Sequence, residues 1–147
     1  MKISIGSDHA GFELKKTLAE WLSQQGHEIN DKGTFSCDSV DYPDFGVSVA
    51  KDVSGGASEK GILVCGSGVG VSIVANKIKG IRAANCYNEE IAALSRAHND
   101  ANVLTLGARF LNTDLAIKIT RVWLETQFEG GRHQQRVDKI SRLEEDG

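Results

Sequence analysis

Short apolar runs alternate with longer segments of helical periodicity along this chain. Brief runs rich in aliphatic and β-branched residues predict five strands, at 2–6, 27–31, 61–65, 81–85 and 103–106. Strands that alternate with helices are typical of βαβ units, in which a parallel sheet is covered by helices on both faces. The pattern therefore predicts an α/β fold with a five-stranded parallel sheet.

The segments between these strands carry helix signals. Apolar residues at i, i+4, i+7 and i+8 form one stripe over 14–22, and Gly26 supplies a stop. Pro43 fits the first turn of a second helix, which Gly55-Gly56 ends. We expect Val47, Ala50 and Val53 on the inward face of that helix, and later helices over about 69–78, 88–97, 112–127 and 133–144.

Length and charge limit the possible functions. The 147 residues fit one domain, 1–147, whose last element is the helix at about 133–144, and folding a chain of this size buries roughly 70% of its surface. A formal charge of −3 argues against a general nucleic-acid or membrane-surface binder, because such a partner needs a positive field over the whole domain. Any basic site must be local.

The cysteines and the apolar stretches indicate a cytoplasmic protein. Cys37, Cys65 and Cys86 are odd in number and lack C-x-x-C spacing, so neither a disulfide framework nor a zinc ribbon is indicated. The N-terminus has no charged leader and h-region, and the longest uncharged stretch, 61–76, is too short and glycine-rich to span a bilayer. We expect no membrane partner.

A glycine-rich loop, CGSGVG at 65–70, follows the third predicted strand. Ligands of open parallel sheets bind outside the carboxyl ends of the strands, and glycines let several backbone N–H groups converge on an anion. No Gly-Lys-Ser/Thr follows, so the loop is not a nucleotide-binding Walker loop. Val71 stands where a dinucleotide fingerprint has its third glycine and where a cysteine phosphatase loop has its arginine. Nucleotide binding and phosphatase chemistry are therefore disfavoured.

Three residues in this pattern are candidates for proton transfer. Backbone dipoles around the loop favour a thiolate at Cys65, although a strand-end cysteine packed as a small hydrophobe is the simpler interpretation of this residue alone. His98 ends a predicted helix, whose dipole favours the imidazolium and suits a general acid or a plain cap. His9 follows the first strand and can face the same crevice, whereas Asp8 can cap the next helix.

Arginines form a local basic cluster. Arg132 and Arg136 lie four apart at the start of the last predicted helix, on one face, and Arg109 follows the last strand. Arginine pairs with phosphate through two hydrogen bonds, although a solvated charged face is the simpler alternative. The four histidines, at 9, 27, 98 and 133, lack metal-ligand spacing in sequence, so we expect no metal and no cofactor.

Five motifs in order resemble the B-type ribose-5-phosphate isomerase family, and the resemblance runs over about 3–140. The motifs are GSDHAG at 6–11, DYPD at 41–44, CGSGVG at 65–70, SRAHND at 95–100 and GGRHQQR at 130–136. The resemblance implies a Rossmann-like three-layer α/β/α sandwich. It also implies a homodimer or homotetramer with sites at subunit interfaces, and reversible conversion of D-ribose 5-phosphate to D-ribulose 5-phosphate.

The resemblance further implies a role for each site residue. The cysteine matching Cys65 moves a proton between C2 and C1 through an enediolate, the histidine matching His98 helps to open the furanose ring, and Ser67 relays a proton or donates a hydrogen bond. Substrate binding is implied for Asp8, His9, Tyr42, Gly66, Ser67, Gly68, Val69, Gly70, Asn99, Arg109, Arg132 and Arg136, the arginines acting mainly on phosphate.

Ser67 departs from the family pattern, because many members have threonine there. Serine keeps the hydroxyl but loses the methyl that restricts its rotamer, so the reaction type is better specified than the sugar. Two alternatives follow from the sequence: an isomerase of galactose 6-phosphate or another hexose phosphate, and a non-catalytic sugar-phosphate-binding module on the same fold.

Overall fold

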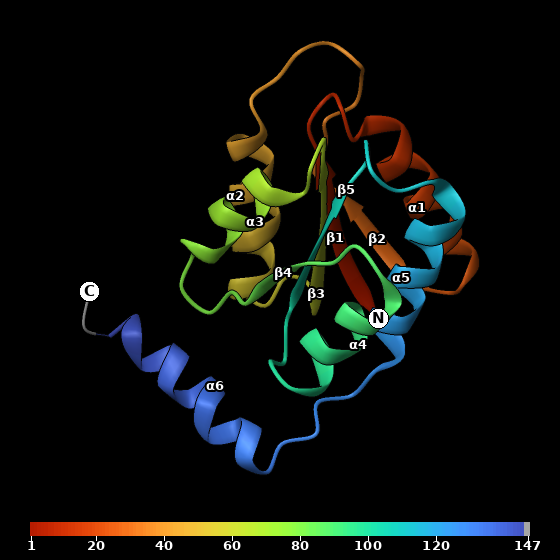
Figure 1. The fold of residues 1–147 in the computed structure, drawn as a ribbon. Helices are drawn as coiled ribbons and strands as arrows, with labels where there is room; N and C mark the ends of the chain where they lie inside the picture. The colour runs from red at the N-terminus through yellow and green to blue at the C-terminus, as the bar shows by residue number, and fades with distance from the viewer. Residues whose placement is uncertain (146–147) are drawn as a thin grey trace.

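The computed structural model describes residues 1–145 and contains a five-stranded sheet with the strand order β2-β1-β3-β5-β4, in which every neighbouring pair is parallel (Figure 1). The sheet confirms the predicted fold class. Its strands are β1 (Lys2–Ser7), β2 (Glu28–Asp31), β3 (Lys60–Cys65), β4 (Ala83–Asn85) and β5 (Val103–Gly107).

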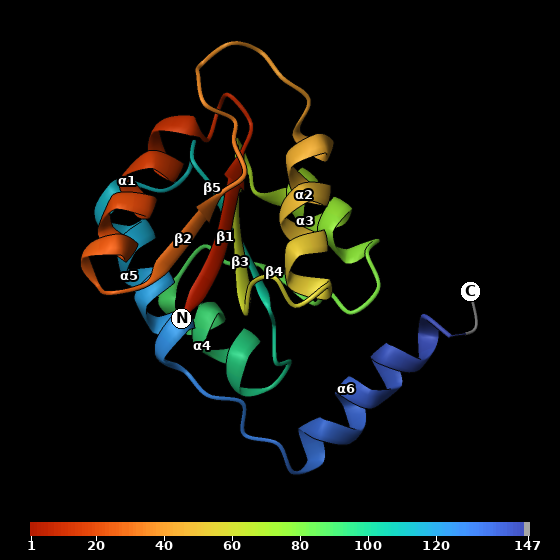
Figure 2. The same cartoon turned by 180° about the vertical axis from the view of Figure 1, so that it is seen from behind.

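Helices cover both faces of the sheet and complete a three-layer sandwich. In Figures 1 and 2, α2 and α3 lie on one face and α1 and α5 lie on the other, while α6 extends away from the layers. Among the described residues, none of the helices combines the length and hydrophobicity that a membrane crossing requires. The helices are α1 (Phe12–Gln24), α2 (Tyr42–Ser54), α3 (Val69–Asn76), α4 (Glu89–Ala97), α5 (Thr113–Glu125) and α6 (Arg132–Leu143).

Strand β3 is apolar from Gly61 to Cys65 because both of its faces are buried there. Ile62 and Val64 belong to the core that packs on α1 and α5, whereas Leu63 and Cys65 belong to the core beneath α2 and α3. Successive side chains of a strand point to opposite faces, so this continuous apolar run is what a central parallel strand requires. Cys65 is thereby directed toward the α2 and α3 layer at the end of the strand.

The prediction for the inward face of α2 was partly wrong. Ala50 is buried and Val53 packs half-buried against the same core, as predicted, but Val49 rather than Val47 is the fully buried valine of the helix. Gly46 explains the rotation, because a Cβ there would lie 2.9 Å from Val74 of α3. The glycine lets α2 and α3 approach closely, and the buried face is therefore i, i+3, i+4.

The strand order creates a crevice between β1 and β3. From β1 the chain crosses through α1 to β2 on one side, and it later returns through α2 to β3 on the other side. The connections that leave the carboxyl ends of these two neighbours diverge, which defines the switch point where doubly wound proteins bind ligands. The loop over 32–41 arches above this edge of the sheet (Figures 1 and 2).

Candidate active site

A cavity of about 640 Å³ opens at the carboxyl ends of β1 and β3. Residues from three of the five motifs reach it together with Arg109, and most of the predicted substrate-binding residues line it. The lining comprises Asp8, His9, Ala10, Tyr42, Cys65, Gly66, Ser67, Val69, Gly70, Ile73, Arg109 and Phe110.

The loop between β3 and α3 places backbone donors around Cys65. The N–H of Gly68 donates to Cys65 Sγ at 3.1 Å, and the N–H of Val69 donates to Ser67 Oγ at 3.1 Å. Gly68 has a φ of 80°, a left-handed conformation that glycine adopts without strain. Helix α3 begins at Val69, so the N–H groups of Gly70 and Val71 in its first turn, which have no acceptor within the helix, extend the same cluster of donors.

Cys65 is only 5% exposed, yet it lines the cavity. Both interpretations of this residue therefore hold in part: its side chain packs in the core beneath α2 and α3, and its sulfur accepts a hydrogen bond at the cavity floor. A thiolate in this position is screened from bulk water and faces backbone N–H groups.

Cys86 provides a contrast to Cys65. Burial raises the pKa of its thiol to about 11, an effect that the Ser95 hydroxyl at 3.9 Å only partly offsets. Cys86 thus remains a protonated thiol at neutral pH.

Two glycines of the loop allow side chains to close over the cavity. A Cβ on Gly70 would lie 2.6 Å from the Tyr42 ring, and a Cβ on Gly66 would lie 3.2 Å from the Arg109 guanidinium. The ring and the cation therefore pack directly against the loop backbone. Arg109 is held there by its own N–H, which donates to the Gly66 carbonyl at 3.0 Å.

Asp8 and His9 are fixed by main-chain groups. Asp8 Oδ1 accepts the N–H of Gly11 at 3.1 Å, which closes the turn before α1, whereas Gly11 and not Asp8 is the N-cap of that helix. His9 Nδ1 accepts the N–H of Val40 at 3.1 Å from the loop over 32–41. Because Nδ1 is the acceptor, the proton of the neutral ring is on Nε2. His9 is then a hydrogen-bond donor at that nitrogen.

Asn85 and Thr105 support the loop from β4 and β5, and sequence reasoning missed both. Thr105 Oγ1 donates to Asn85 Oδ1 at 3.2 Å, and Asn85 Nδ2 donates to the Ser67 carbonyl at 3.5 Å. The side chain of Asn85 lies directly against Gly68. A single asparagine at a strand end carries no pattern that would have indicated this role.

The remaining predicted residues lie at the opposite end of the sheet, near the amino ends of the strands. His98 caps the end of α4, and the segment after it leads into the start of β5 at Val103, which pairs with Gly61. Cys65 is four residues further along β3, about 13 Å at 3.3 Å a residue. One chain therefore does not bring His98, Asn99, Arg132 and Arg136 to the Cys65 cavity.

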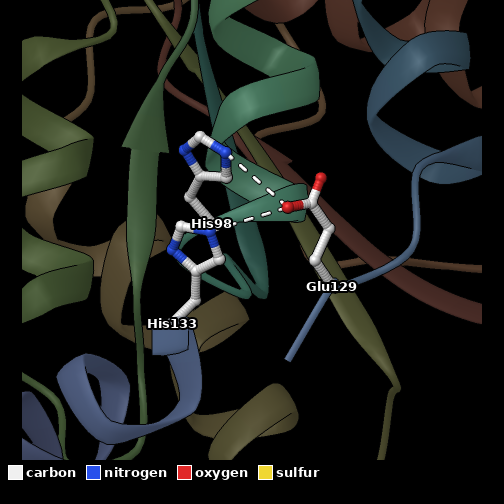
Figure 3. Close-up of side chains that lie close together, drawn as sticks. All are labelled: His98, Glu129 and His133. Atoms are coloured by element: carbon white, nitrogen blue, oxygen red, sulfur yellow. Dashed lines mark ion pairs between the residues drawn. The ribbon is translucent and has the colours of Figure 1, made fainter. Parts of the chain in front are cut away.

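His98 and His133 form a cluster of their own with Glu129 (Figure 3). The two rings stack with centroids 4.2 Å apart and an interplanar angle of 11°. Glu129 Oε1 lies 3.9 Å from His98 Nε2 and 3.6 Å from His133 Nε2. Burial, followed by the positive fields of His98 and Arg132, lowers the pKa of His133.

Arg132 and Arg136 are exposed cations at the start of α6. Within residues 1–145, neither forms an ion pair. Positive charge in a first helical turn opposes the helix dipole, so an anion bound there would be stabilised by both guanidinium groups.

These features define a doubly wound α/β protein that carries a thiol inside a glycine-rich loop of backbone donors at its switch point. The chain belongs to the Ribose/Galactose Isomerase family, whose model matches residues 3–140. The family resemblance seen in the sequence motifs is thereby confirmed.

Individual relatives match over nearly the full chain. It is 50% identical to ribose-5-phosphate isomerase B of Escherichia coli (strain K12) over 144 residues, which are 98% of this chain and 97% of the relative. The solved structure of Clostridium thermocellum ribose-5-phosphate isomerase B superposes with a TM-score of 0.98 at 52% identity, over 99% of each chain. Mycoplasma genitalium ribose-5-phosphate isomerase B with bound ribulose-5-phosphate gives a TM-score of 0.96 at 45% identity, over 99% of this chain and 97% of that one.

Proposed function

We propose that the protein interconverts D-ribose 5-phosphate and D-ribulose 5-phosphate by proton transfer through an enediolate. The observation that carries the proposal is Cys65, whose sulfur lies at the floor of a cavity and accepts the N–H of Gly68. Support comes from relatives at this level of identity that are ribose-5-phosphate isomerases B, one of them with ribulose-5-phosphate bound.

Cys65 is the base of the proposed reaction. Its thiolate takes the proton from C2 of the open-chain aldose, and the electrons of that C–H bond form the C1–C2 double bond while the carbonyl π electrons move to O1. Backbone N–H groups at the start of α3 stabilise the negative oxygen. The thiol then returns the proton to C1, and Ser67 relays the hydroxyl proton between O1 and O2. These steps use only groups of the protein, without a cofactor.

The complete site is proposed to combine two copies of the chain. Four of the predicted residues lie at the opposite end of the sheet from Cys65. His98 assists ring opening, and Asn99, Arg132 and Arg136 hold the substrate and its phosphate. A homodimer, or a homotetramer built from it, places them over the Cys65 cavity of the neighbour. Asp8, His9, Tyr42 and Arg109 are proposed to bind substrate within that cavity.

Exposed apolar residues accompany both parts of the proposed site. Val69, Ile73 and Phe110 are exposed around the mouth of the cavity, and Ile140 and Leu143 are exposed on α6. An interface between two chains would cover apolar side chains at both places. Because Cys37, Cys65 and Cys86 are free thiols, we propose the reducing cytoplasm as the compartment in which residues 1–147 act.

The reaction can be tested with Cys65→Ala. Purified protein is mixed with ribose 5-phosphate and ketose formation is followed. We expect the variant to lose at least about 10³-fold in kcat, because the base is absent. Cys86→Ala serves as the control, since that thiol is buried and lies outside the cavity lining. Equal turnover in Cys65→Ala and the parent would remove Cys65 from the mechanism.

A second measurement separates an isomerase from a sugar-phosphate-binding module. In heavy water, an isomerase exchanges solvent deuterium into the sugar carbon, whereas a binding module retains the ligand without exchange. Binding without exchange would overturn the proposed reaction. The same assay across five- and six-carbon phosphates identifies the preferred sugar.

A further inference from the structure

Folding brings together three metal-ligating side chains that are separated in sequence. His98 comes from the cap of α4, Glu129 from the segment before α6, and His133 from the first turn of α6. Their ligand atoms all lie within 4.8 Å of one another, and both histidines are directed toward the carboxylate in Figure 3. The expectation that no metal binds rested on sequence spacing alone, and the fold removes that argument for this cluster.

The dimensions of the cluster are close to those of a tetrahedral site. With ligand bonds of about 2.1 Å, two donors of a tetrahedron are about 3.4 Å apart. Glu129 Oε1 lies 3.9 Å from His98 Nε2 and 3.6 Å from His133 Nε2, a few tenths of an ångström wider. The rings, 11° from parallel, must tilt to aim both nitrogens at one ion. The His98 and Glu129 side chains, 39% and 59% exposed, have room to do so.

Glu129 supplies the negative charge of the cluster, and Arg132 and Arg136 lie beside His133 at the start of α6. The same arginines repel a cation, so the carboxylate of Glu129 is the group that offsets them. Affinity should therefore depend strongly on Glu129.

We propose that His98, Glu129 and His133 bind a divalent transition-metal ion, with Zn²⁺ as the best match to two imidazoles and one carboxylate. The ion would be an inhibitor rather than a cofactor. It occupies Nε2 of His98, the group proposed to open the sugar ring, and it joins the cap of α4 to the start of α6. This inhibitory consequence rests on the proposed function, whereas the binding site itself does not.

Calorimetric titration with Zn²⁺ tests the site without any turnover. The parent for the titration carries Cys37→Ser and Cys65→Ala, so that neither the exposed thiol nor the cavity thiol competes, and Cys86 stays as a buried thiol. We expect Glu129→Gln to weaken the Zn²⁺ affinity at least tenfold. His133→Phe should do the same while its ring keeps the stack on His98.

His27→Gln is the matched control. His27 Nδ1 lies 3.1 Å from the N-terminal amine, so this pair is the competing nitrogen site at a distant surface. The proposal requires unchanged Zn²⁺ affinity in His27→Gln. It would be overturned by absence of Zn²⁺ binding, by equal affinity in Glu129→Gln and its parent, or by loss of binding only in His27→Gln.

Inhibition is measured separately in the protein with its native cysteines. Zn²⁺ should reduce ketose formation and a chelator should restore it, with the inhibitory concentration raised at least tenfold in Glu129→Gln. Metal binding in the calorimeter with no such shift would overturn the inhibitory role and leave the site in place.

Discussion

Gly68 has the backbone conformation on which the donor loop depends. Its φ of 80° directs its N–H to Cys65 Sγ, and its missing side chain leaves space for Asn85 and for the backbone of β5. A Cβ at this position would lie 2.9 Å from the carbonyl carbon of Leu106. A side chain at position 68 would therefore strain the backbone and would also disturb the hydrogen bond to the sulfur.

We expect Gly68→Ala to lower kcat by about 10²-fold, because the donor moves away from the sulfur and the developing oxyanion. The left-handed conformation should also cost about 1–2 kcal/mol of stability. Gly56→Ala is the matched control, since Gly56 has a φ of 83° with nothing within 4 Å of a Cβ. Both variants should lose the backbone contribution, Gly68→Ala should lose more because its Cβ meets Asn85 and the backbone of β5, and activity should fall only in Gly68→Ala. Equal activity in both variants would contradict the role of the loop.

The low pKa of His133 predicts a pH dependence of stability. Its pKa in the folded state lies below the usual 6.5, so the unfolded chain binds the proton more readily. Stability contributed by the neutral ring is complete above pH 6.5 and is lost as the pH falls toward the folded-state pKa. His98, Arg132 and Arg136 lower this pKa, and Glu129 raises it.

Urea unfolding of the parent and His133→Phe between pH 5 and pH 8 measures this effect, with the pH range chosen around the ordinary histidine pKa of about 6.5. The parent should lose stability relative to the variant as the pH falls. Parallel stability curves would mean that His133 has the same proton affinity in both states.

Local patterns predicted the Cys65 cavity well. The loop at 65–70, Asp8-His9 and Arg109 all follow strands, and parallel strands deliver such residues to one edge without any tertiary detail. The stack of His98 on His133 could not be predicted from periodicity, because it depends on the path of the chain between α5 and α6. The support from Asn85 depends in the same way on the pairing of β4 with β5.

At the level of elements, a buried ion pair joins α1 to the end of β2. Lys15 is 1% exposed, and its Nζ donates to both carboxylate oxygens of Asp31 at 2.6 and 2.7 Å. Asp31 Oδ1 also accepts the N–H of Gly33 at 2.9 Å. Gly33 lies near the start of the loop over 32–41. The pair therefore fixes the loop whose Val40 N–H bonds to His9.

We expect Lys15→Met to destabilise the protein by about 2 kcal/mol, less than for a fully enclosed pair because Asp31 still contacts water. Lys16→Met is the control, since Lys16 is the exposed neighbour on the same helix. The free energy of unfolding in urea is the measurement. Equal values for the two variants would show that the ion pair contributes nothing net.

Most elements followed from the sequence, with errors at the edge of the sheet. The strand expected from Ile81 begins only at Ala83, because Ile81 packs in the core from the loop before β4. Edge strand β4 has three residues, Ala-Ala-Asn, all half-buried, and lacks the apolar alternation that marks a strand. The bounds of β1, β2, β3 and β5 were each predicted to within one residue, and the central strands, buried on both faces, gave the strongest signal.

For the whole molecule, the distribution of site residues over two sheet edges predicts complementation between chains. Cys65→Ala and His98→Asn should each be inactive, because each lacks one half of every site. Refolding them together should recover about a quarter of the parent activity, since half of random dimers are mixed and each of these has one intact site.

Cys65→Ala refolded with Arg109→Ala is the control pair. Both residues line the same cavity, so no combination of these two chains contains an intact site. Activity recovered in this control, or none recovered with His98→Asn, would refute the division of the site between two chains.

The proposed division of the site between two chains predicts a particular rate law for the protein. At concentrations where the proposed dimer dissociates, the active species forms by encounter of two chains, so the initial velocity rises with the square of the chain concentration. Above that range the velocity becomes proportional to concentration. Because Cys65 and His98 lie at opposite ends of the sheet in one chain, the proposed arrangement predicts that dilution alone lowers the activity per chain.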